Sequence, residues 1–354
     1  MERKRISAAE CPRYKNERLK RGIMIRKTKI AGIGRYVPER IVTNKDLEKL
    51  MDTTDEWIIA RTGIHERRWV DSRIGTSDLA VKAAERALEM ANISAIDIDL
   101  IIFATISSDY KFPGSAVQIQ DKMGMDTIGA FDIKAACSAF VYGLSIGDQY
   151  VKTGQANNVL VIGAEIQSTG IDLSTKGRDM AVLFGDGAGA AILQPSNGNS
   201  EILSTHIHSQ GKYLKELWGE VPSSIQSPRI TKEMIDEGRH FPQMNGREVF
   251  RNAVTRFPEV IKEALDKNNL TVDDVKMFIP HQANLRITQS VAKRLGVGMD
   301  RMYSNIERYG NTTAASIPIA LAEAHLEGKI KKDDIVVLAA FGSGFTWASA
   351  AIRW

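Results

Sequence analysis

The sequence predicts an α/β fold made of two similar halves, residues 24–200 and 201–354, each a sheet covered by helices. Two pairs of matching segments lead to this prediction. The first pair is RALEMANISAIDIDLIIFAT (86–105) and EALDKNNLTVDDVKMFIPHQ (263–282), which align without gaps at a spacing of 177 residues. Each segment has the pattern of a helix end, a short polar turn and a buried strand.

The second pair consists of a helix and the strand that follows it. In the first half we expect a helix from Cys137 to near Gly154 and then the strand NVLVIGAE; in the second, a helix from near Asn311 to near Gly328 and then DIVVLAAFGSG. Small and apolar residues on all sides are typical of buried helices, and glycine is common at helix ends. If a pseudo-twofold axis relates the halves, Cys137 and Asn311 occupy equivalent places at two helix N-termini.

Composition excludes several classes of protein. With 47 basic and 43 acidic side chains, the net charge of +4 is too small to indicate nucleic-acid binding. Two cysteines, Cys11 and Cys137, make no disulfide framework, which suits a reducing compartment. No apolar run approaches the roughly 20 residues that span a bilayer, so we expect a cytoplasmic protein with no membrane partner. Residues 1–23 lack the apolar core of a secretory signal, and we expect a disordered basic extension with no role for Cys11.

Cys137 is the strongest candidate for a catalytic residue, because it lies where a strand pattern ends and a helix pattern begins. A helix N-terminus offers unpaired N–H donors and about half a positive charge. We therefore expect a thiol there to ionise more easily, and the same field to stabilise an oxyanion. The alternative is a buried structural cysteine.

His281 and Asn311 complete a candidate set. His281 follows the second buried strand, which Pro280 ends, and lies in a strand-to-helix loop, where α/β proteins build sites. Cysteine, histidine and asparagine can supply a thiolate nucleophile and two neutral donors. Two classes of enzyme use such a set: papain-like cysteine proteases, and enzymes that transfer acyl groups between thioesters and form carbon–carbon bonds. Papain-like proteases have an aromatic residue after the cysteine, which this sequence does not.

Three other features are weaker. GDGAGA (185–190) superficially matches a dinucleotide fingerprint, but a strand pattern follows it instead of a helix, so we expect a β-hairpin turn. His206 and His208 share one face of a strand without a third ligand nearby, and we predict no metal site. Trp57 could belong to the core or to a loop that faces a ligand.

Eight segments strongly resemble the β-ketoacyl-[acyl-carrier-protein] synthase III family. They are TTDEWIIARTGIHER, KFPGSAVQIQ, DIKAACSAFVYGLSIGDQYVKTG, AVLFGDGAGAAIL, MNGREVF, PHQANLRI, ERYGNTTAASIPIAL and FGSGFTWASA, and the resemblance runs in order from residue 25 to residue 354. It implies the thiolase fold, in which two duplicated α/β halves form a five-layered αβαβα arrangement. It also implies a homodimer.

Related families differ at particular residues. Degradative thiolases use a second, C-terminal cysteine, where this chain has FGSGF; elongating ketoacyl synthases use Cys-His-His, where this chain has Asn311; and chalcone-synthase-like enzymes carry GFGPG. The resemblance therefore implies the initiation of type II fatty acid synthesis, by decarboxylative Claisen condensation of a short acyl-CoA with malonyl-acyl carrier protein. A Cys-His-Asn condensing enzyme of a secondary-metabolite pathway is the alternative.

The resemblance assigns the chemical roles. Cys137 takes the acyl group, and His281 and Asn311 hydrogen-bond the malonyl thioester carbonyl. The backbone N–H groups of Cys137 and Ser343 bind the oxyanion that forms on the acyl-enzyme. The family often has glycine where Ser343 stands, which leaves the conformation of this loop open. No metal or redox cofactor is implied.

The resemblance also assigns substrate contacts. Trp57 and Arg61 match positions that hold the CoA adenine, and Arg178 one that reaches its phosphates. Phe112 matches a residue that lines the acyl pocket across the dimer, and its bulk favours a short primer such as acetyl. Carrier proteins are acidic, so a basic patch is expected to steer them. The segment and patch assigned to this partner are Gln282, Ala283, Asn284, Leu285, Arg286, Arg251, Lys293 and Arg294.

Overall fold

Two β-sheets form the framework of the computed structural model, which describes residues 25–354; the predicted extension 1–23 and Cys11 lie outside them. One sheet has the order β1-β7-β6-β4-β5 and the other β11-β12-β13-β8. The strands are β1 (Lys27–Tyr36), β4 (Leu100–Ala104), β5 (Gly129–Ile133), β6 (Val159–Glu165), β7 (Gly187–Ser196), β8 (Glu201–Ser209), β11 (Val275–Pro280), β12 (Ile335–Gly342) and β13 (Thr346–Arg353).

The two sheets share one topology. In the first, β4 and β6 are parallel, and β7 and then β1 continue the sheet in antiparallel pairs. In the second, β11 and β12 are parallel, and β13 and then β8 continue it in the same way. The first sheet has one further strand, β5, which pairs with β4 and leaves an open edge.

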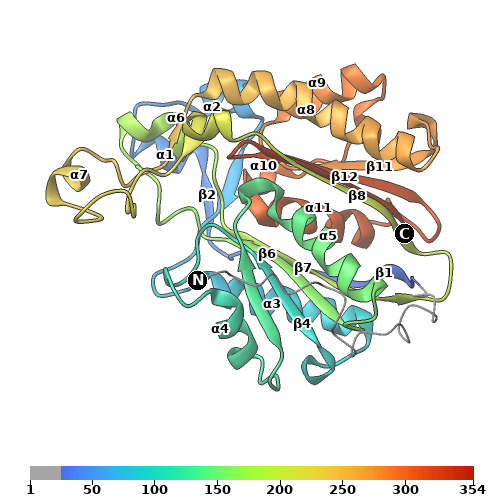
Figure 1. Cartoon of the computed structure of the whole chain (residues 1–354). Coiled ribbons are helices and arrows are strands. Elements are labelled where there is room, and N and C mark those ends of the chain that lie inside the picture. The colour runs from blue at the N-terminus through green and yellow to red at the C-terminus, as the bar shows by residue number, and fades with distance from the viewer. Residues whose placement is uncertain (1–24) are drawn as a thin grey trace, which may run out of the picture.

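Helices and sheets alternate in five layers (Figure 1). Between the sheets lie α5 (Ala139–Lys152) and α11 (Ser316–Leu326), whose side chains form one apolar core with both sheets. Separate cores join the first sheet to α3 (Thr76–Ala91) and α4 (Ser115–Lys122), and the second sheet to α8 (Gly246–Lys267) and α9 (Leu285–Leu295). The predicted αβαβα arrangement is confirmed.

The aligned segments of the two halves form the same local structure. The Ser94 N–H donates to the Asp97 carboxylate at 2.8 Å before β4, and the Thr271 N–H donates to the Asp274 carboxylate at 2.7 Å before β11. Each turn follows a helix that ends near a left-handed asparagine, with φ of 53° and 54°. These polar side chains satisfy the first N–H groups of a short 3-10 turn, as the shared sequence pattern requires.

Each central helix is preceded by a 3-10 turn, η2 (Ala136–Ser138) before α5 and η7 (Thr313–Ala315) before α11. Both turns open on a residue with positive φ, 46° and 50°. Because the turns align at the spacing of 177 residues, Cys137 corresponds to Ala314 and not to Asn311. The predicted equivalence of Cys137 and Asn311 is therefore wrong, since Asn311 lies two residues before η7.

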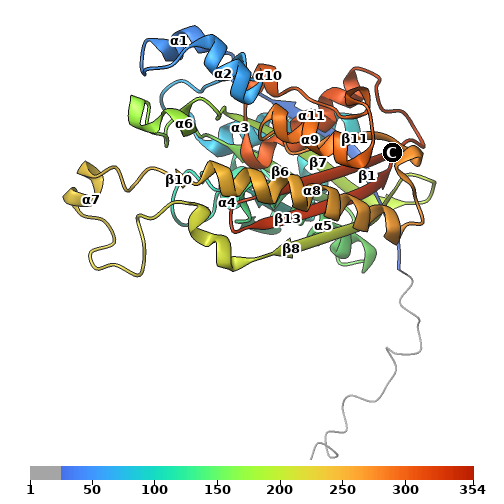
Figure 2. The same ribbon diagram turned by 90° about the horizontal axis from the view of Figure 1, so that it is seen from above.

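The remaining elements are short and connect the strands and helices described above. The 219–242 segment, which contains α7, forms an arm that projects from the body (Figure 2).

The GDGAGA segment makes no hairpin turn, because the residues from Gly187 onward belong to β7, a strand inside the sheet. None of the helices in residues 25–354 has the length and apolar character needed to cross a membrane. These remaining elements are β2 (Ile41–Thr43), α1 (Asn44–Glu48), α2 (Asp55–Thr62), β3 (Glu66–Arg68), η1 (Ala95–Asp97), η3 (Thr175–Gly177), α6 (Arg178–Ala181), η4 (Gly211–Glu216), β9 (Leu217–Trp218), α7 (Lys232–Asp236), β10 (Gln243–Met244), η5 (Val272–Asp274), η6 (Met299–Arg301) and α10 (Ile306–Tyr309).

Candidate active site

Cys137 is buried in η2, where the chain passes from β5 into α5, and only 7% of the residue is exposed. Gly342, the last residue of β12, lies directly against it. A Cβ atom on Gly342 would stand 2.8 Å from the Cys137 Cβ and 3.2 Å from its Sγ. Any side chain at position 342 would therefore displace the cysteine, and the two halves of the chain meet at its sulfur.

Two backbone N–H groups face this sulfur. Hydrogen bonding from the N–H groups of Cys137 and Ser343 lowers the pKa of the Cys137 thiol. These are the donors expected to bind an oxyanion. The turn and the loop that carry them are joined by a hydrogen bond of 3.2 Å between the hydroxyls of Ser138 and Thr346.

Burial opposes this effect and is larger. Burial, together with the nearby Glu165 carboxylate, raises the pKa of the Cys137 thiol to about 12. The prediction that the helix N-terminus makes this thiol easier to ionise is therefore wrong. The free energy needed to remove a thiolate from water is larger than the stabilisation that the two amides give it. Glu165 is itself buried at the end of β6, where it accepts the Ser107 hydroxyl at 2.6 Å, and burial raises its pKa to about 7.

His281 lies just after β11 and is 2% exposed. Burial lowers its pKa to about 3, so the imidazole is neutral near pH 7. Its Nδ1 atom lies 2.6 Å from the hydroxyl oxygen of Ser316, which also accepts the Gln282 N–H at 3.4 Å. The hydroxyl can then donate its hydrogen to Nδ1, which assigns the ring hydrogen to Nε2. In residues 25–354, no side chain or backbone group hydrogen-bonds Nε2.

Asn311 is held by its backbone and by its side-chain oxygen. Its N–H donates to the Leu183 carbonyl at 2.8 Å, and its own carbonyl accepts the Gly185 N–H at 3.1 Å. Its Oδ1 accepts the Thr313 N–H at 2.9 Å, which fixes the amide orientation. The Nδ2 group makes no hydrogen bond within residues 25–354 and is the donor that Asn311 can offer to a substrate.

The elements that carry these three residues adjoin one another. The His281 N–H donates to the Ala339 carbonyl of β12 at 2.8 Å, three residues before the glycine that contacts Cys137. Asn311 leads into η7, which contacts η2, and alanines from both helix starts share one small apolar core. A thiol, a neutral imidazole and an oriented carboxamide thus lie where the two halves meet.

The three residues assigned to CoA form one cluster. The guanidinium carbons of Arg61 and Arg178 lie 4.3 Å and 4.5 Å from the centre of the Trp57 ring. Trp57 is half-buried on α2, and Arg178 also donates to the Asp52 carbonyl at 2.8 Å. An aromatic ring beside two cations offers the stacking and charge that purines and phosphates bind.

The residues assigned to the carrier protein divide into two groups. Arg251, Arg286, Lys293 and Arg294 are exposed on α8 and α9, and the Arg286 guanidinium lies 5.8 Å from the Phe250 ring. Ala283, Asn284 and Leu285 are half-buried.

Gln282 does not belong with them. It is 1% exposed, and its amide bonds the Pro280 carbonyl at 2.6 Å and the Asn305 N–H at 3.2 Å. The prediction that Gln282 contacts the carrier protein is therefore wrong, because its side chain is buried and hydrogen-bonded within this chain.

Phe112 is exposed instead of packed against the rest of the described chain. It is 83% exposed in the loop between β4 and α4. The loop lies beside the open edge strand β5, since the Ser115 N–H donates to the Asp132 carboxylate at 2.8 Å. Phe112 therefore faces outward next to an unpaired sheet edge.

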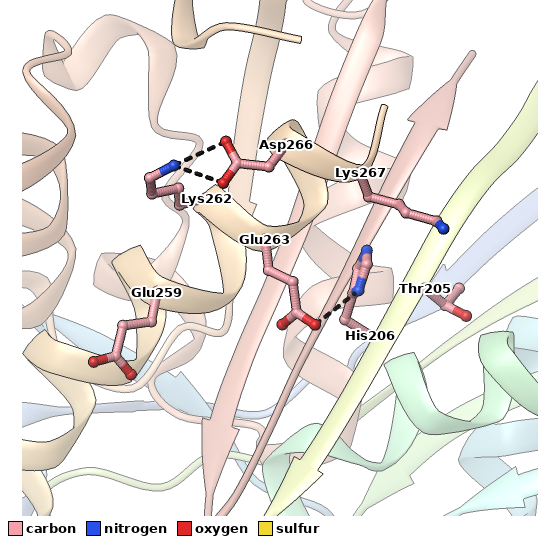
Figure 3. A pocket seen from close by; sticks show the side chains of 7 residues that line it. All are labelled: Thr205, His206, Glu259, Lys262, Glu263, Asp266 and Lys267. Carbon is pink, nitrogen blue, oxygen red and sulfur yellow. Dashed lines mark hydrogen bonds and ion pairs between the residues drawn. The ribbon is translucent and has the colours of Figure 1, made fainter. Parts of the chain in front are cut away.

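A pocket of about 810 Å³ lies elsewhere, between β8 and α8 (Figure 3). His206 and His208 both contact the Glu263 carboxylate there, at 3.2 Å and 2.6 Å. Lys262 pairs with Asp266 at 2.6 Å on the same helix. None of the three candidate catalytic residues lines this pocket.

Sequence reasoning missed three residues that contact or influence the candidate catalytic side chains. Glu165 ends a strand that is otherwise apolar, and this pattern was the only signal for a buried carboxylate. Ser316 lies five residues after Asn311, but nothing in the sequence indicates that it faces His281. Gly342 is one of 28 glycines, and only its position before Ser343 distinguishes it.

Comparison with known proteins shows the family of this chain. The description 3-oxoacyl-[acyl-carrier-protein (ACP)] synthase III matches residues 131–211, and that of the C-terminal part of the same family matches residues 265–354. Fold and site define a thiolase-fold condensing enzyme, which is an acyltransferase. The chain belongs to the β-ketoacyl-[acyl-carrier-protein] synthase III family.

Whole-chain similarities support this assignment. The chain is 48% identical to β-ketoacyl-[acyl-carrier-protein] synthase III of Clostridioides difficile, over 93% of this chain and 98% of the relative. It is similar to the crystal structure of 3-oxoacyl-[acyl-carrier-protein] synthase III from Aquifex aeolicus, with a TM-score of 0.85, 42% identity and coverage of 92% and 100%. The priming β-ketosynthase of the R1128 polyketide pathway has the same TM-score, 35% identity and coverage of 94% and 97%.

Proposed function

We propose that Cys137, His281 and Asn311 catalyse the condensation that initiates fatty acid synthesis, in which a short acyl-CoA reacts with malonyl-acyl carrier protein. The observation that carries the proposal is that two kinds of donor lie on elements that adjoin one buried sulfur. Backbone amides lie close to the sulfur itself. A neutral imidazole follows β11, which pairs with the strand that contacts Cys137, and an oriented carboxamide leads into η7, which contacts η2. Such preorganised donors stabilise negative charge as it develops.

In the first step Cys137 attacks the thioester carbonyl of the acyl-CoA. The carbonyl oxygen becomes an oxyanion that the N–H groups of Cys137 and Ser343 stabilise. The C–S bond to CoA then breaks, and the proton from the Cys137 thiol leaves with CoA as its free thiol. Because burial favours the neutral thiol, the proton stays on the sulfur until the bound substrate excludes water and the departing CoA thiolate can take it.

In the second step the malonyl group loses CO₂. The electron pair of the broken C–C bond stays on the remaining fragment, which becomes an enolate. The Nε2–H of His281 and the Nδ2–H of Asn311 hold the enolate oxygen. The enolate carbon attacks the Cys137 thioester, the C–S bond breaks, and the sulfur regains a proton. The product is a 3-oxoacyl-carrier protein. Besides the two thioesters, the two steps consume one proton from water, which the Cys137 thiolate takes up, and they release CoA and CO₂.

Both substrates enter from one side in this proposal. Trp57, Arg61 and Arg178 hold the adenine and phosphates of CoA, and Arg286 with its basic neighbours attracts the acidic carrier protein. The two regions adjoin, since the Asn284 amide donates to the Arg61 carbonyl at 2.9 Å. A pantetheine arm from either substrate can then follow the same path to Cys137.

We also propose a homodimer built on the open edge of β5. An unpaired sheet edge with exposed apolar residues nearby is a common site of association. Phe112 would then enter the acyl pocket of the partner subunit, and its size would favour acetyl as the primer. Rates with acetyl-, isobutyryl- and longer acyl-CoAs test this preference.

Trapping of the acyl-enzyme tests the central step. The protein is incubated with radiolabelled acetyl-CoA and then denatured, and bound label is measured. We expect about one label per chain, lost on treatment with hydroxylamine, and none in Cys137→Ser. Equal labelling of Cys137→Ser would remove this cysteine from its proposed role.

The division of labour has its own test. His281→Ala and Asn311→Ala are expected to form the acyl-enzyme but to release CO₂ from malonyl-carrier protein about 10²–10³-fold more slowly, because each removes one donor to the enolate. A block of acylation in either variant would contradict the assignment.

A further inference from the structure

The Ser343 side chain makes a bond that a glycine in its place could not. Ser343 directly follows β12, and its hydroxyl donates to the backbone carbonyl of Leu217 in β9. It also follows Gly342, which lies directly against Cys137, and its backbone N–H is close enough to the sulfur to lower the pKa of the thiol. One residue therefore carries both an oxyanion donor and a tether to another part of the chain.

The other side of the same residue is also held. The Thr346 hydroxyl oxygen lies 3.1 Å from the Ser343 carbonyl oxygen and 3.2 Å from the Ala135 carbonyl oxygen, just before η2. Thr346 thus connects the loop to the turn that contains Cys137. Leu217 and Thr346 thus give the Ser343 hydroxyl and the Ser343 carbonyl each a fixed partner.

Leu217 joins the loop to the region assigned to CoA. It pairs with Met244 across the base of the 219–242 arm. Its side chain packs against the core of the second half and also against the core that contains Trp57 and Met180. The Ser343 hydroxyl therefore anchors the oxyanion loop to a strand that contacts both regions.

We propose that the Ser343 hydroxyl is a positioning group, which fixes the direction of the Ser343 N–H toward the sulfur by binding Leu217. This inference rests on the proposed function, since it concerns the oxyanion of the acyl-transfer step. Without the hydroxyl, the N–H remains but its peptide can rotate. Glycine would add further backbone freedom at the same place.

Single-turnover acylation by radiolabelled acetyl-CoA tests the proposal. We expect Ser343→Ala to acylate about tenfold more slowly, the effect of one hydrogen bond, and Ser343→Gly more slowly still. Ser343→Thr, which keeps a hydroxyl, is expected to recover most of the lost rate. Alkylation of Cys137 by iodoacetamide forms no oxyanion and depends on this N–H only through the thiol pKa, so its rate is expected to fall much less than the acylation rate in Ser343→Ala and Ser343→Gly.

Ser349→Ala is the matched control, because its buried hydroxyl donates to the Val260 carbonyl at 2.8 Å in the same sheet but away from the sulfur. Acylation of Ser343→Ala at the rate of Ser349→Ala would overturn the inference. A parallel fall in alkylation and acylation would also overturn it, since that pattern indicates general damage. If the unaltered protein takes no label that depends on Cys137, the proposed function fails as well.

Discussion

Ser316 and His281 are linked by 2.6 Å between a hydroxyl oxygen and Nδ1, and Ser316 is also the first residue of α11. The turn that leads into this helix begins just after Asn311. One helix start therefore fixes the amide orientation of Asn311, through the Thr313 N–H, and the ring hydrogen of His281, through the Ser316 hydroxyl. Both proposed enolate donors depend on the same local structure.

Ser316→Ala is expected to slow the decarboxylation of malonyl-carrier protein about tenfold, because His281 loses the partner that keeps its hydrogen on Nε2. Acyl-enzyme formation is expected to stay unchanged, since this step does not use His281. Release of labelled CO₂ and trapping of labelled acetyl measure the two steps separately. Unchanged CO₂ release would show that Ser316 does not set the tautomer.

The buried, neutral state of His281 predicts how stability depends on pH. Its pKa is about 3 in the folded chain and 6.5 as a free side chain, so between these values the unfolded chain binds more protons. The stability due to this group is complete above pH 6.5 and is lost as the pH falls toward 3. The loss between pH 7 and pH 5 is expected to be about 2 kcal/mol.

Urea unfolding at both pH values measures this loss. In His281→Gln, which cannot take up the proton, the difference between pH 7 and pH 5 is expected to be smaller by about that amount. An identical pH dependence in the two proteins would mean that His281 is not held neutral by burial.

Features that depend on neighbouring residues were predictable from the sequence, and features that depend on distant ones were not. The turns before β4 and β11 followed from local side chains, such as Ser94 with Asp97. The starts of α5 and α11 did not, because packing sets them: a Cβ on Gly163 would stand 2.3 Å from the Ala314 carbonyl oxygen. Only glycine allows η7 to approach the sheet so closely.

The chemistry of the site divides in the same way. The motifs indicated Cys137, His281 and Asn311, but a helix N-terminus alone gave the wrong direction for the thiol pKa. The thiol pKa is raised because β12 buries the sulfur and Glu165 lies near it. Neither contact can be read from the residues next to Cys137 in the sequence. Gln282 was misassigned for the same reason, since its partners lie on other elements.

The raised pKa of Cys137 predicts its reactivity in the absence of substrate. With a pKa of about 12, the thiolate fraction grows about tenfold per pH unit across the range from 7 to 10. The rate of alkylation by iodoacetamide, followed by mass spectrometry of the peptide that contains Cys137, is expected to rise in proportion and to show no plateau. A plateau near pH 7 would indicate a thiolate that the helix already stabilises.

The carrier-protein patch predicts a selective loss of affinity. Arg286 and Lys293 are two helical turns apart on α9 and so share one face of the helix, and both are exposed. Arg286→Glu reverses a charge on this face and is expected to raise the KM for malonyl-carrier protein about tenfold, corresponding to about 1.4 kcal/mol. The KM for acetyl-CoA is expected to change little, because Arg286 is not assigned to CoA.

Lys262→Glu is the matched control for this charge reversal. Lys262 is exposed on α8 but pairs with Asp266 and lines the pocket of Figure 3 instead of the proposed docking face. It changes the net charge by the same amount, so it separates local docking from general attraction between the protein and an acidic partner. Steady-state kinetics at low and moderate salt measure both variants, and the Arg286 effect is expected to shrink as salt screens the charges. Equal effects of the two reversals on the carrier protein would place docking elsewhere.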